Sequence, residues 1–99
     1  MAQSVTISAP CNASSTAIPC TAAGSAFPSN NATIRGMAYQ INAGPMNPIP
    51  VAIPNGGNWS FQLTPTDCPM VGILYQLTVY QGDSSGLIVT NVTQFTRSA

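Results

Sequence analysis

Apolar and polar residues alternate along several short stretches of the chain, and a period of two is typical of β-strands with one buried face. In residues 57–63 the large apolar positions are Trp59, Phe61 and Leu63, separated by small or polar residues. Residues 73–79 repeat the pattern, with these side chains predicted inward: Ile73, Tyr75, Leu77 and Val79. We therefore predict two half-buried strands and place these side chains in the core of the domain.

Weaker alternation marks two further strands. Residues 5–8 alternate until Pro10 ends the pattern, which returns from residue 32. In this second stretch the two faces of the predicted strand differ: Ile34, Gly36 and Ala38 on one, and Thr33, Arg35, Met37 and Tyr39 on the other. Both stretches are predicted to be short strands.

Two stretches need more than alternation to be placed. Residues 49–53 alternate, but prolines flank and interrupt them, and proline cannot donate to a sheet ladder. We therefore predict an edge strand at 48–54, which should resist strand addition by a neighbouring chain. In the last strand, predicted at 87–97, Val92 and Phe95 are three residues apart, so they need either a bulge or opposite faces.

No stretch shows a helical period, and residues 10–31 show no lasting period. That segment carries three prolines among many small polar residues, so we expect a long ordered loop or an irregular hairpin between the first and second main strands. Short strands about ten residues apart, joined by turns rich in Gly, Pro and Asn, are typical of an antiparallel sandwich. The prediction is an all-β fold in which residues 1–99 form a single domain.

Charged residues are unusually rare. They make up 4% of the chain, and the net charge is zero. Binding to phosphates depends on counterions displaced by Lys and Arg, so a neutral chain is a poor partner for nucleic acid or an anionic membrane. No apolar segment reaches the roughly 18 residues that insertion across a membrane needs. Neutral polar faces instead suit contact with other proteins, because little charge has to be desolvated.

The chain offers few groups for catalysis or metal binding. It has no His, Lys or Glu, so acid and base catalysis would fall to Asp67 and Asp83. The three cysteines, Cys11, Cys20 and Cys68, do not follow zinc-binding spacing, and no histidine completes a site. We therefore predict no catalytic residue, no cofactor and no metal.

Five stretches, taken in order, resemble the immunoglobulin-like domains found in bacterial surface proteins and in phage structural proteins. They are VTISAP, TIRGMAY, GNWSFQL, YQLTVYQGDSSG and NVTQFTR, and the resemblance covers most of residues 4–97. The resemblance rests on a Gly-x-Ala core step, a Gly-x-Trp strand, a Tyr-x-Leu-x-Val strand and an Asp-x-x-Gly turn: Gly36, Ala38, Gly57, Trp59, Tyr75, Leu77, Val79, Asp83 and Gly86. It implies an immunoglobulin-like antiparallel β-sandwich of about seven strands. It implies little about function, because one fold carries many functions.

The resemblance also implies where loops and charges lie. Asp67 and Asp83 would sit at opposite ends of the sandwich, too far apart to act as a pair of catalytic carboxylates. The long loop and the connection that holds Cys68 would share one end. A local disulfide between Cys11 and Cys20 is the preferred pairing, and Cys68 is the rival partner of either cysteine. A reducing cytoplasm would leave all three as thiols.

Three aromatic side chains are candidates for a contact surface. Trp59 with Tyr39 or Tyr80 could form a platform for a sugar. The row that Trp59 shares with Phe61 and Leu63 instead favours the core, where burying so large a ring contributes most to stability. Tyr80 lies opposite the inward row of its strand and is predicted to face outward. We therefore name Tyr80 and Tyr39 as candidate surface contacts.

These features predict a non-enzymatic structural or interaction module. The chain starts at Met1, begins its first strand by Val5 and shows no signal peptide, so we expect a small gene product made in a cytoplasm. A phage virion decoration or fibre-type protein on the virion surface, docking on a capsid or on sister subunits, fits best. The alternative is one repeat of an exported adhesin at the bacterial cell surface, in contact with neighbouring domains. A carbohydrate-binding module, with a cell-surface glycan as its partner, is third.

Overall fold

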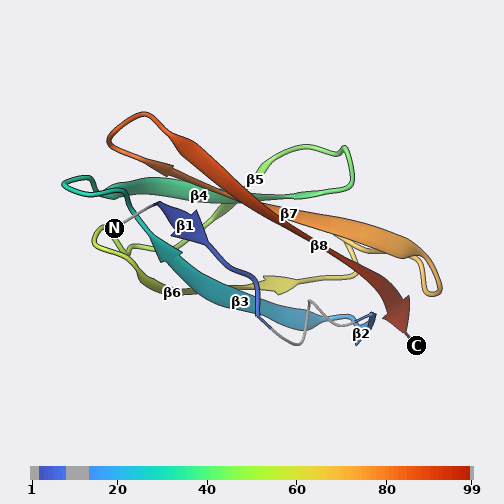
Figure 1. Ribbon diagram of the computed structural model, residues 1–99. Coiled ribbons are helices and arrows are strands. Elements are labelled where there is room, and N and C mark those ends of the chain that lie inside the picture. The colour runs from blue at the N-terminus through green and yellow to red at the C-terminus, as the bar shows by residue number, and fades with distance from the viewer. Residues whose placement is uncertain (1–2, 9–13, 99) are drawn as a thin grey trace.

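The computed structural model describes residues 3–8 and 14–98, which form two β-sheets packed face to face (Figure 1). The strands are β1 (Ser4–Val5), β2 (Ser15–Ala17), β3 (Cys20–Phe27), β4 (Ile34–Ile41), β5 (Asn47–Ile49), β6 (Gly57–Leu63), β7 (Leu74–Asp83) and β8 (Ile88–Ser98). The molecule is elongated and measures 44 × 23 × 18 Å. Nowhere in the described part of the chain is there a helix that could span a membrane. The predicted all-β sandwich is confirmed.

The three-stranded sheet has the order β1-β3-β6, and the five-stranded sheet has the order β2-β8-β7-β4-β5. Neighbouring strands run antiparallel except β2, which pairs parallel with β8. β1 and β2 follow each other in the chain but belong to different sheets. The described residues thus form eight strands where about seven were predicted.

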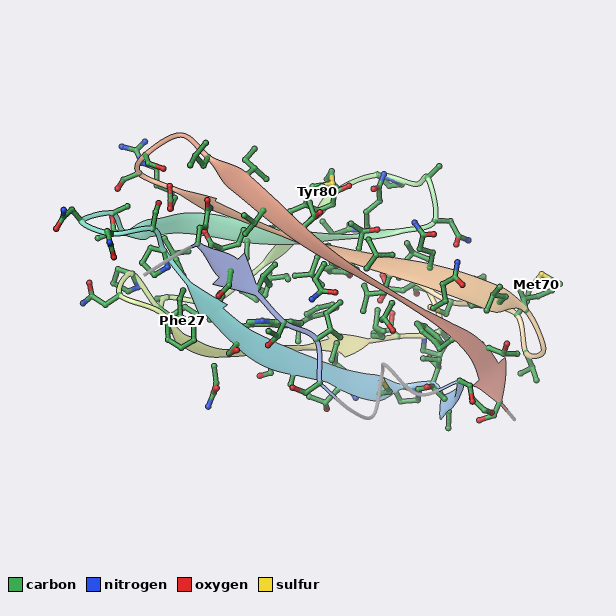
Figure 2. All side chains as sticks on the ribbon, viewed as in Figure 1. Phe27, Met70 and Tyr80 are labelled. Atoms are coloured by element: carbon green, nitrogen blue, oxygen red, sulfur yellow. The ribbon has the colours of Figure 1, made fainter. Side chains whose placement is uncertain are left out.

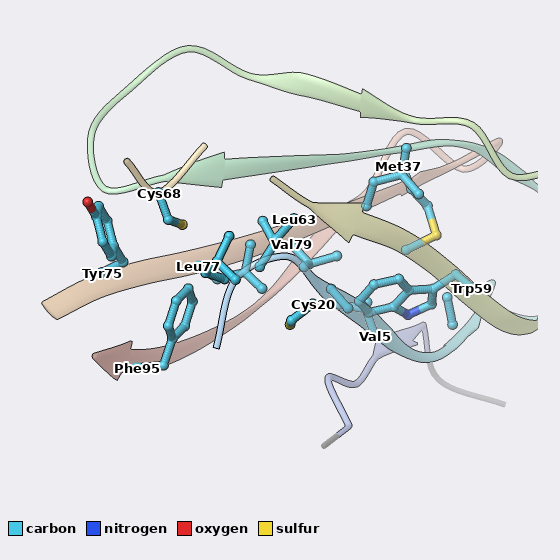
Figure 3. Packing of buried hydrophobic residues seen from close by; sticks show 14 residues of the cluster. Val5, Cys20, Met37, Trp59, Leu63, Cys68, Tyr75, Leu77, Val79 and Phe95 are labelled. Carbon is cyan, nitrogen blue, oxygen red and sulfur yellow. The ribbon is translucent and has the colours of Figure 1, made fainter. Parts of the chain in front are cut away.

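Large side chains from the five-stranded sheet and from β6 fill the space between the sheets (Figure 3). Most residues of the two predicted inward rows are buried there: Trp59, Leu63, Tyr75, Leu77 and Val79. Phe61 is half-buried, and its ring stacks on Trp59 with 5.9 Å between centroids. Ile73 is exposed, contrary to prediction, because β7 begins only at Leu74 and Ile73 lies in the connection before it.

The prediction that residues 10–31 form no regular element is wrong for β2 and β3. The inward positions of β3 are small: Cys20, Ala22, Gly24 and Ala26. The Trp59 ring lies across this face, since a Cβ on Gly24 would come within 2.9 Å of Trp59 Cζ2. The indole N–H also donates to the Ser25 carbonyl at 3.2 Å. A strand with small side chains on both faces shows no alternation of hydrophobicity, so the pattern did not predict it.

The core face of β4 is opposite to the one that the resemblance implied through Gly36 and Ala38. Met37 is buried, Tyr39 packs against the core, and Gly36 is exposed. The register of β4 on β7 shifts between Ile34 and Gly36. Such a shift changes which residues face inward on its two sides, so the step of Gly36 and Ala38 lies on the outer face.

The pairing settles two further strands. β5 is the edge strand of the five-stranded sheet, as the prolines predicted, although it covers only Asn47–Ile49. β8 pairs with β7 without a shift from Ile88 to Thr96. Val92 and Phe95 therefore lie on opposite faces of β8, and Phe95 is buried while Val92 is exposed.

Candidate interaction surfaces

Four large apolar side chains stand exposed at one end of the sandwich. Their exposed fractions are 60% for Met70, 54% for Val71, 42% for Ile73 and 56% for Leu74. They lie where the connection from β6 enters β7, and Figure 2 shows Met70 projecting from that end. We call residues 70–74 the apolar loop. A contiguous exposed apolar patch on a small protein is typical of an interaction site.

Hydrogen bonds hold the backbone of the apolar loop. The Tyr75 hydroxyl accepts from the Met70 N–H at 2.9 Å. At the end of β8, the Gly72 N–H donates to the Arg97 carbonyl at 2.8 Å, and the Arg97 N–H donates to the Ile73 carbonyl at 3.1 Å. The loop is therefore ordered while its apolar side chains meet solvent. An ordered loop loses little conformational entropy when it binds a partner.

The apolar loop is a surface that alternation did not predict. Its signal is visible in the sequence as the run Met70-Val71-Gly72-Ile73-Leu74. Consecutive large apolar residues cannot all reach one face of a strand, because successive side chains point to opposite sides. The alternation rule nevertheless assigned Ile73 to the inward row of β7.

The outer face of the five-stranded sheet is a second candidate surface. The outward positions aligned on β4, β7 and β8 are all uncharged: Ala38, Gln40, Gln76, Thr78, Tyr80, Thr90, Val92 and Gln94. Tyr80 lies on β7, the middle strand of this face (Figure 2). It is half-buried, and its hydroxyl donates to Gln40 Oε1 at 2.8 Å. Tyr80 thus faces outward, although its neighbours on the sheet cover part of the ring.

Tyr39, the other predicted surface contact, packs on the inner side of the sheet instead. Its ring stacks on Phe61 with 4.2 Å between centroids and 17° between planes. Its hydroxyl donates to Asp67 Oδ1 at 2.9 Å. Burial, followed by this hydrogen bond, raises the pKa of Tyr39 to about 12. Tyr39 therefore ties β4 to the connection between β6 and β7 and is withdrawn as a surface contact.

Asp67 serves the local backbone. Its Oδ2 accepts from the Thr64 N–H at 2.9 Å and from the Thr64 hydroxyl at 3.1 Å, while Oδ1 accepts from Tyr39. A depression of about 440 Å³ lies beside Asp67. Both carboxylate oxygens accept hydrogen bonds from the protein, so Asp67 is held in a fixed position beside this depression.

Asp83 binds two loops together at the other end of β4. It accepts from the N–H groups of Ser29 and Ser85, each at 2.9 Å, and from both serine hydroxyls. The two hydroxyls, followed by the N–H groups, hold the pKa of Asp83 well below its usual range. Asp67 is bonded to Tyr39 in the second half of β4, whereas Asp83 is paired with Ile34 at the start of β4. The two carboxylates are therefore separated along the strand and too far apart to act as a catalytic pair.

The two cysteines among the described residues differ in state. Cys20 is disulfide-bonded, whereas Cys68 is a buried free thiol. The rival pairing through Cys68 is therefore contradicted. Cys11 lies outside the described residues, so its bridge to Cys20 stays a prediction. Burial raises the pKa of Cys68 to about 11, which keeps it a protonated and weakly reactive thiol at neutral pH.

Comparisons with protein-family models and with curated proteins find no match to this chain. Within residues 3–8 and 14–98, no three His, Cys, Asp or Glu side chains gather as a metal site would require. The functional conclusion therefore rests on the sandwich and on its exposed surfaces.

Proposed function

We propose that this chain is a non-enzymatic, immunoglobulin-like interaction module that docks on another protein through the apolar loop. The observation that carries the proposal is the exposure of four large apolar side chains on a backbone held by hydrogen bonds. Removing such side chains from water is favourable by about 25 cal/mol for each Å² of apolar surface, before the entropic cost of association is subtracted. The chain has only 4% charged residues, so docking desolvates little charge.

Topology supports the immunoglobulin-like class. Such sandwiches keep their second and fifth main strands in one sheet and their third, sixth and seventh in the other. Here β3 pairs with β6, while β4, β7 and β8 share the five-stranded sheet. The sheet membership of these five strands supports the immunoglobulin-like class, whereas β5, the fourth main strand, departs from the seven-strand arrangement by pairing with β4.

A tyrosine supports the same class. Immunoglobulin-like sandwiches carry a tyrosine near the start of the sixth main strand, and its hydroxyl bonds to the backbone a few residues upstream. Tyr75 begins β7 in this way and bonds to the Met70 N–H. In antibody domains a cysteine follows two residues later, whereas this chain has the fully buried Leu77. Apolar packing takes the place of the disulfide between the sheets.

As the most specific role we propose a virion decoration or fibre-type protein, with a capsid or sister subunits as the partner. Two features favour it: the small domain with few charged residues and the ordered apolar loop at one end. Many copies of a small docking patch act together on a particle, so each contact needs only modest affinity.

The adhesin repeat remains the second candidate because of one observation. Cys20 is disulfide-bonded, and disulfides persist mainly in oxidising compartments such as the cell exterior. The carbohydrate-binding module has no comparable support. Trp59 is 1% exposed and Tyr39 packs inward, so the aromatic platform proposed for a sugar is not available.

The source of the protein tests the role. An antibody against the purified domain should detect it in virus particles from the natural source, and its intact mass should be about that of the 10.2 kDa chain. Detection only within a much longer polypeptide at the cell surface would contradict the virion role and support the adhesin repeat.

Paired variants test the docking surface. Leu74→Ser removes an apolar side chain that is 56% exposed from the apolar loop. Leu87→Ser removes one that is 60% exposed from the β7–β8 turn. We expect Leu74→Ser to weaken binding to purified particles about tenfold, because central apolar contacts dominate interface affinity. Leu87→Ser should bind as the unmodified chain does. Equal binding by both variants would contradict docking through the apolar loop.

A further inference from the structure

The two sheets of the described residues have four edge strands, and three of these are poorly suited to pairing with another strand. β1 has two residues, β2 has three, and β5 has three with Pro48 in the middle. β6 is the fourth, with seven residues, no proline and no charge. Short strands, prolines and charges are the means by which proteins prevent strand addition, and β6 has none of them.

The hydrogen bonds on the other side of β3 show how β6 is oriented. Two bonds reach β3 from residues 6–8: the Thr6 N–H to the Ser25 carbonyl at 2.8 Å, and the Ser8 N–H to the Ala23 carbonyl at 2.7 Å. The backbone groups of successive residues in a strand point to opposite sides. Gly24 therefore directs its N–H and C=O toward β6, where its partner is Trp59.

The same alternation continues along β6. Because Trp59 bonds toward β3, the residues on either side of it direct their backbone groups away from β3. These groups belong to Asn58, Ser60 and Gln62, and among the described residues no strand pairs with that side of β6. Their side chains are exposed on the outer face. The open edge thus presents a regular row of N–H and C=O groups.

We propose that β6 pairs antiparallel with β6 of a second copy of this chain, about a twofold axis at Ser60. In this register Ser60 of one copy faces Ser60 of the other, and Asn58 faces Gln62. These are the residues whose backbone groups point outward, so each facing pair exchanges two hydrogen bonds. The two three-stranded sheets then form one continuous sheet.

The side chains of β6 are complementary to themselves in this register. On the outer face, amide faces amide and hydroxyl faces hydroxyl, which are favourable cross-strand pairs. On the inner side, the backbone positions of Trp59 and Phe61 face each other across the axis, and the Trp59 ring stays directed across β3. No charged residue lies on β6, so no like charges meet. A foreign extended peptide would match the backbone but not this set of pairs, which favours a second copy as the occupant.

Charge placed at the twofold axis tests the partner and the register together. Ser60→Lys and Ser60→Asp each put two like charges opposite one another in a homodimer, whereas a mixture of the two puts a lysine opposite an aspartate. Native mass spectrometry and sedimentation measure the species of twice the 10.2 kDa chain mass. We expect the unmodified chain to dimerise. Each variant alone should lose about tenfold or more in dimer affinity, and the mixture should regain it as a heterodimer.

The control adds the same charge away from the edge. Thr21 is exposed on β3, the strand next to β6, where it pairs with Gln62. Thr21→Lys should therefore leave the dimer intact. A monomeric unmodified chain, a dimer that Ser60→Lys leaves unchanged, or an equal loss with Thr21→Lys overturns the proposal. Loss of the dimer in Leu74→Ser would assign self-association to the apolar loop and overturn it too. Docking through the apolar loop is judged separately, by binding to particles.

Discussion

The inner faces of the two sheets differ in the size of their side chains. In β3, the middle strand of the three-stranded sheet, the inward side chains are small, whereas in β7 they include Tyr75, Leu77 and Val79. Trp59 explains the difference, because its ring extends from β6 across the inner face of β3. A small residue on β3 is therefore as specific a packing choice as a large one on β7. The two sheets should respond differently to an added methyl group.

Gly24→Ala should have the largest effect. The added Cβ would overlap the Thr6 carbonyl oxygen and lie 2.9 Å from Trp59 Cζ2, and neither the backbone nor the packed ring can move easily. We expect the free energy of unfolding to fall by about 3 kcal/mol or more, as for an overpacked core. Urea denaturation followed by Trp59 fluorescence measures it.

Gly36→Ala, on the outer face of β4, is the control for adding a methyl group to a strand glycine without any new contact. A Cβ added there meets no atom within 4 Å. Stability should stay unchanged or rise slightly, because alanine loses less conformational entropy than glycine on folding. Similar losses for Gly24→Ala and Gly36→Ala would show that the loss in Gly24→Ala does not come from the contacts of the added Cβ with Thr6 and Trp59.

Gln81→Leu should have the next largest effect, because Gln81 joins the two sheets. Its fully buried Nε2 donates to the Phe27 carbonyl at 2.8 Å and to the Ser4 carbonyl at 3.2 Å. Leucine has a similar volume but leaves both carbonyls without this donor, so we expect a loss of about 2 kcal/mol in urea denaturation. Gln94→Leu, on the exposed outer face of β8, should change stability by less than about 0.5 kcal/mol. Equal stability of the two variants would argue against this polar link.

Asp83 should give a smaller effect that depends on pH. It ties Ser29, in the connection between the sheets, to the end of β7. Its folded-state pKa is lowered from an unfolded value of about 4, so its contribution to stability is complete above that pH and is lost as the pH falls through the folded-state pKa. Asp83→Asn should lower stability at neutral pH and flatten its decline in acid. Urea midpoints measured from neutral to acidic pH would refute this if the two curves ran parallel.

Cys68 should show the smallest effect and reports how tightly the sheets close. It lies on the connection between β6 and β7 and is buried in the core cluster (Figure 3), and its pKa is raised to about 11. Iodoacetamide at neutral pH should modify it slowly in the native protein and rapidly in urea, as mass spectrometry would show. Labelling should accelerate in Gly24→Ala but not in Gly36→Ala. Fast labelling of the native unmodified chain would contradict the closed packing.

Alternation predicted β6 and most of β7 because each has one large apolar face and one polar face. Alternation failed to predict β3, because the inward residues of β3 are small and the Trp59 ring fills the space over them. The resemblance, not alternation, implied a core face for β4, and that face is wrong because the register shift after Ile34 depends on pairing with β7. Tyr80 was placed outward for the same reason that Tyr75 was placed inward. The apolar loop was missed, because its residues have the composition of a core.

The sequence by itself determined an all-β sandwich with a neutral surface. Period-two alternation and turn residues are local properties, and charge is a property of composition. Only the tertiary structure decided that residues 70–74 stand exposed and that β6 has an unpaired edge. Whether a side chain is covered, or a strand has a neighbour, depends on residues distant in the chain. The local sequence pattern contains no information about those distant residues.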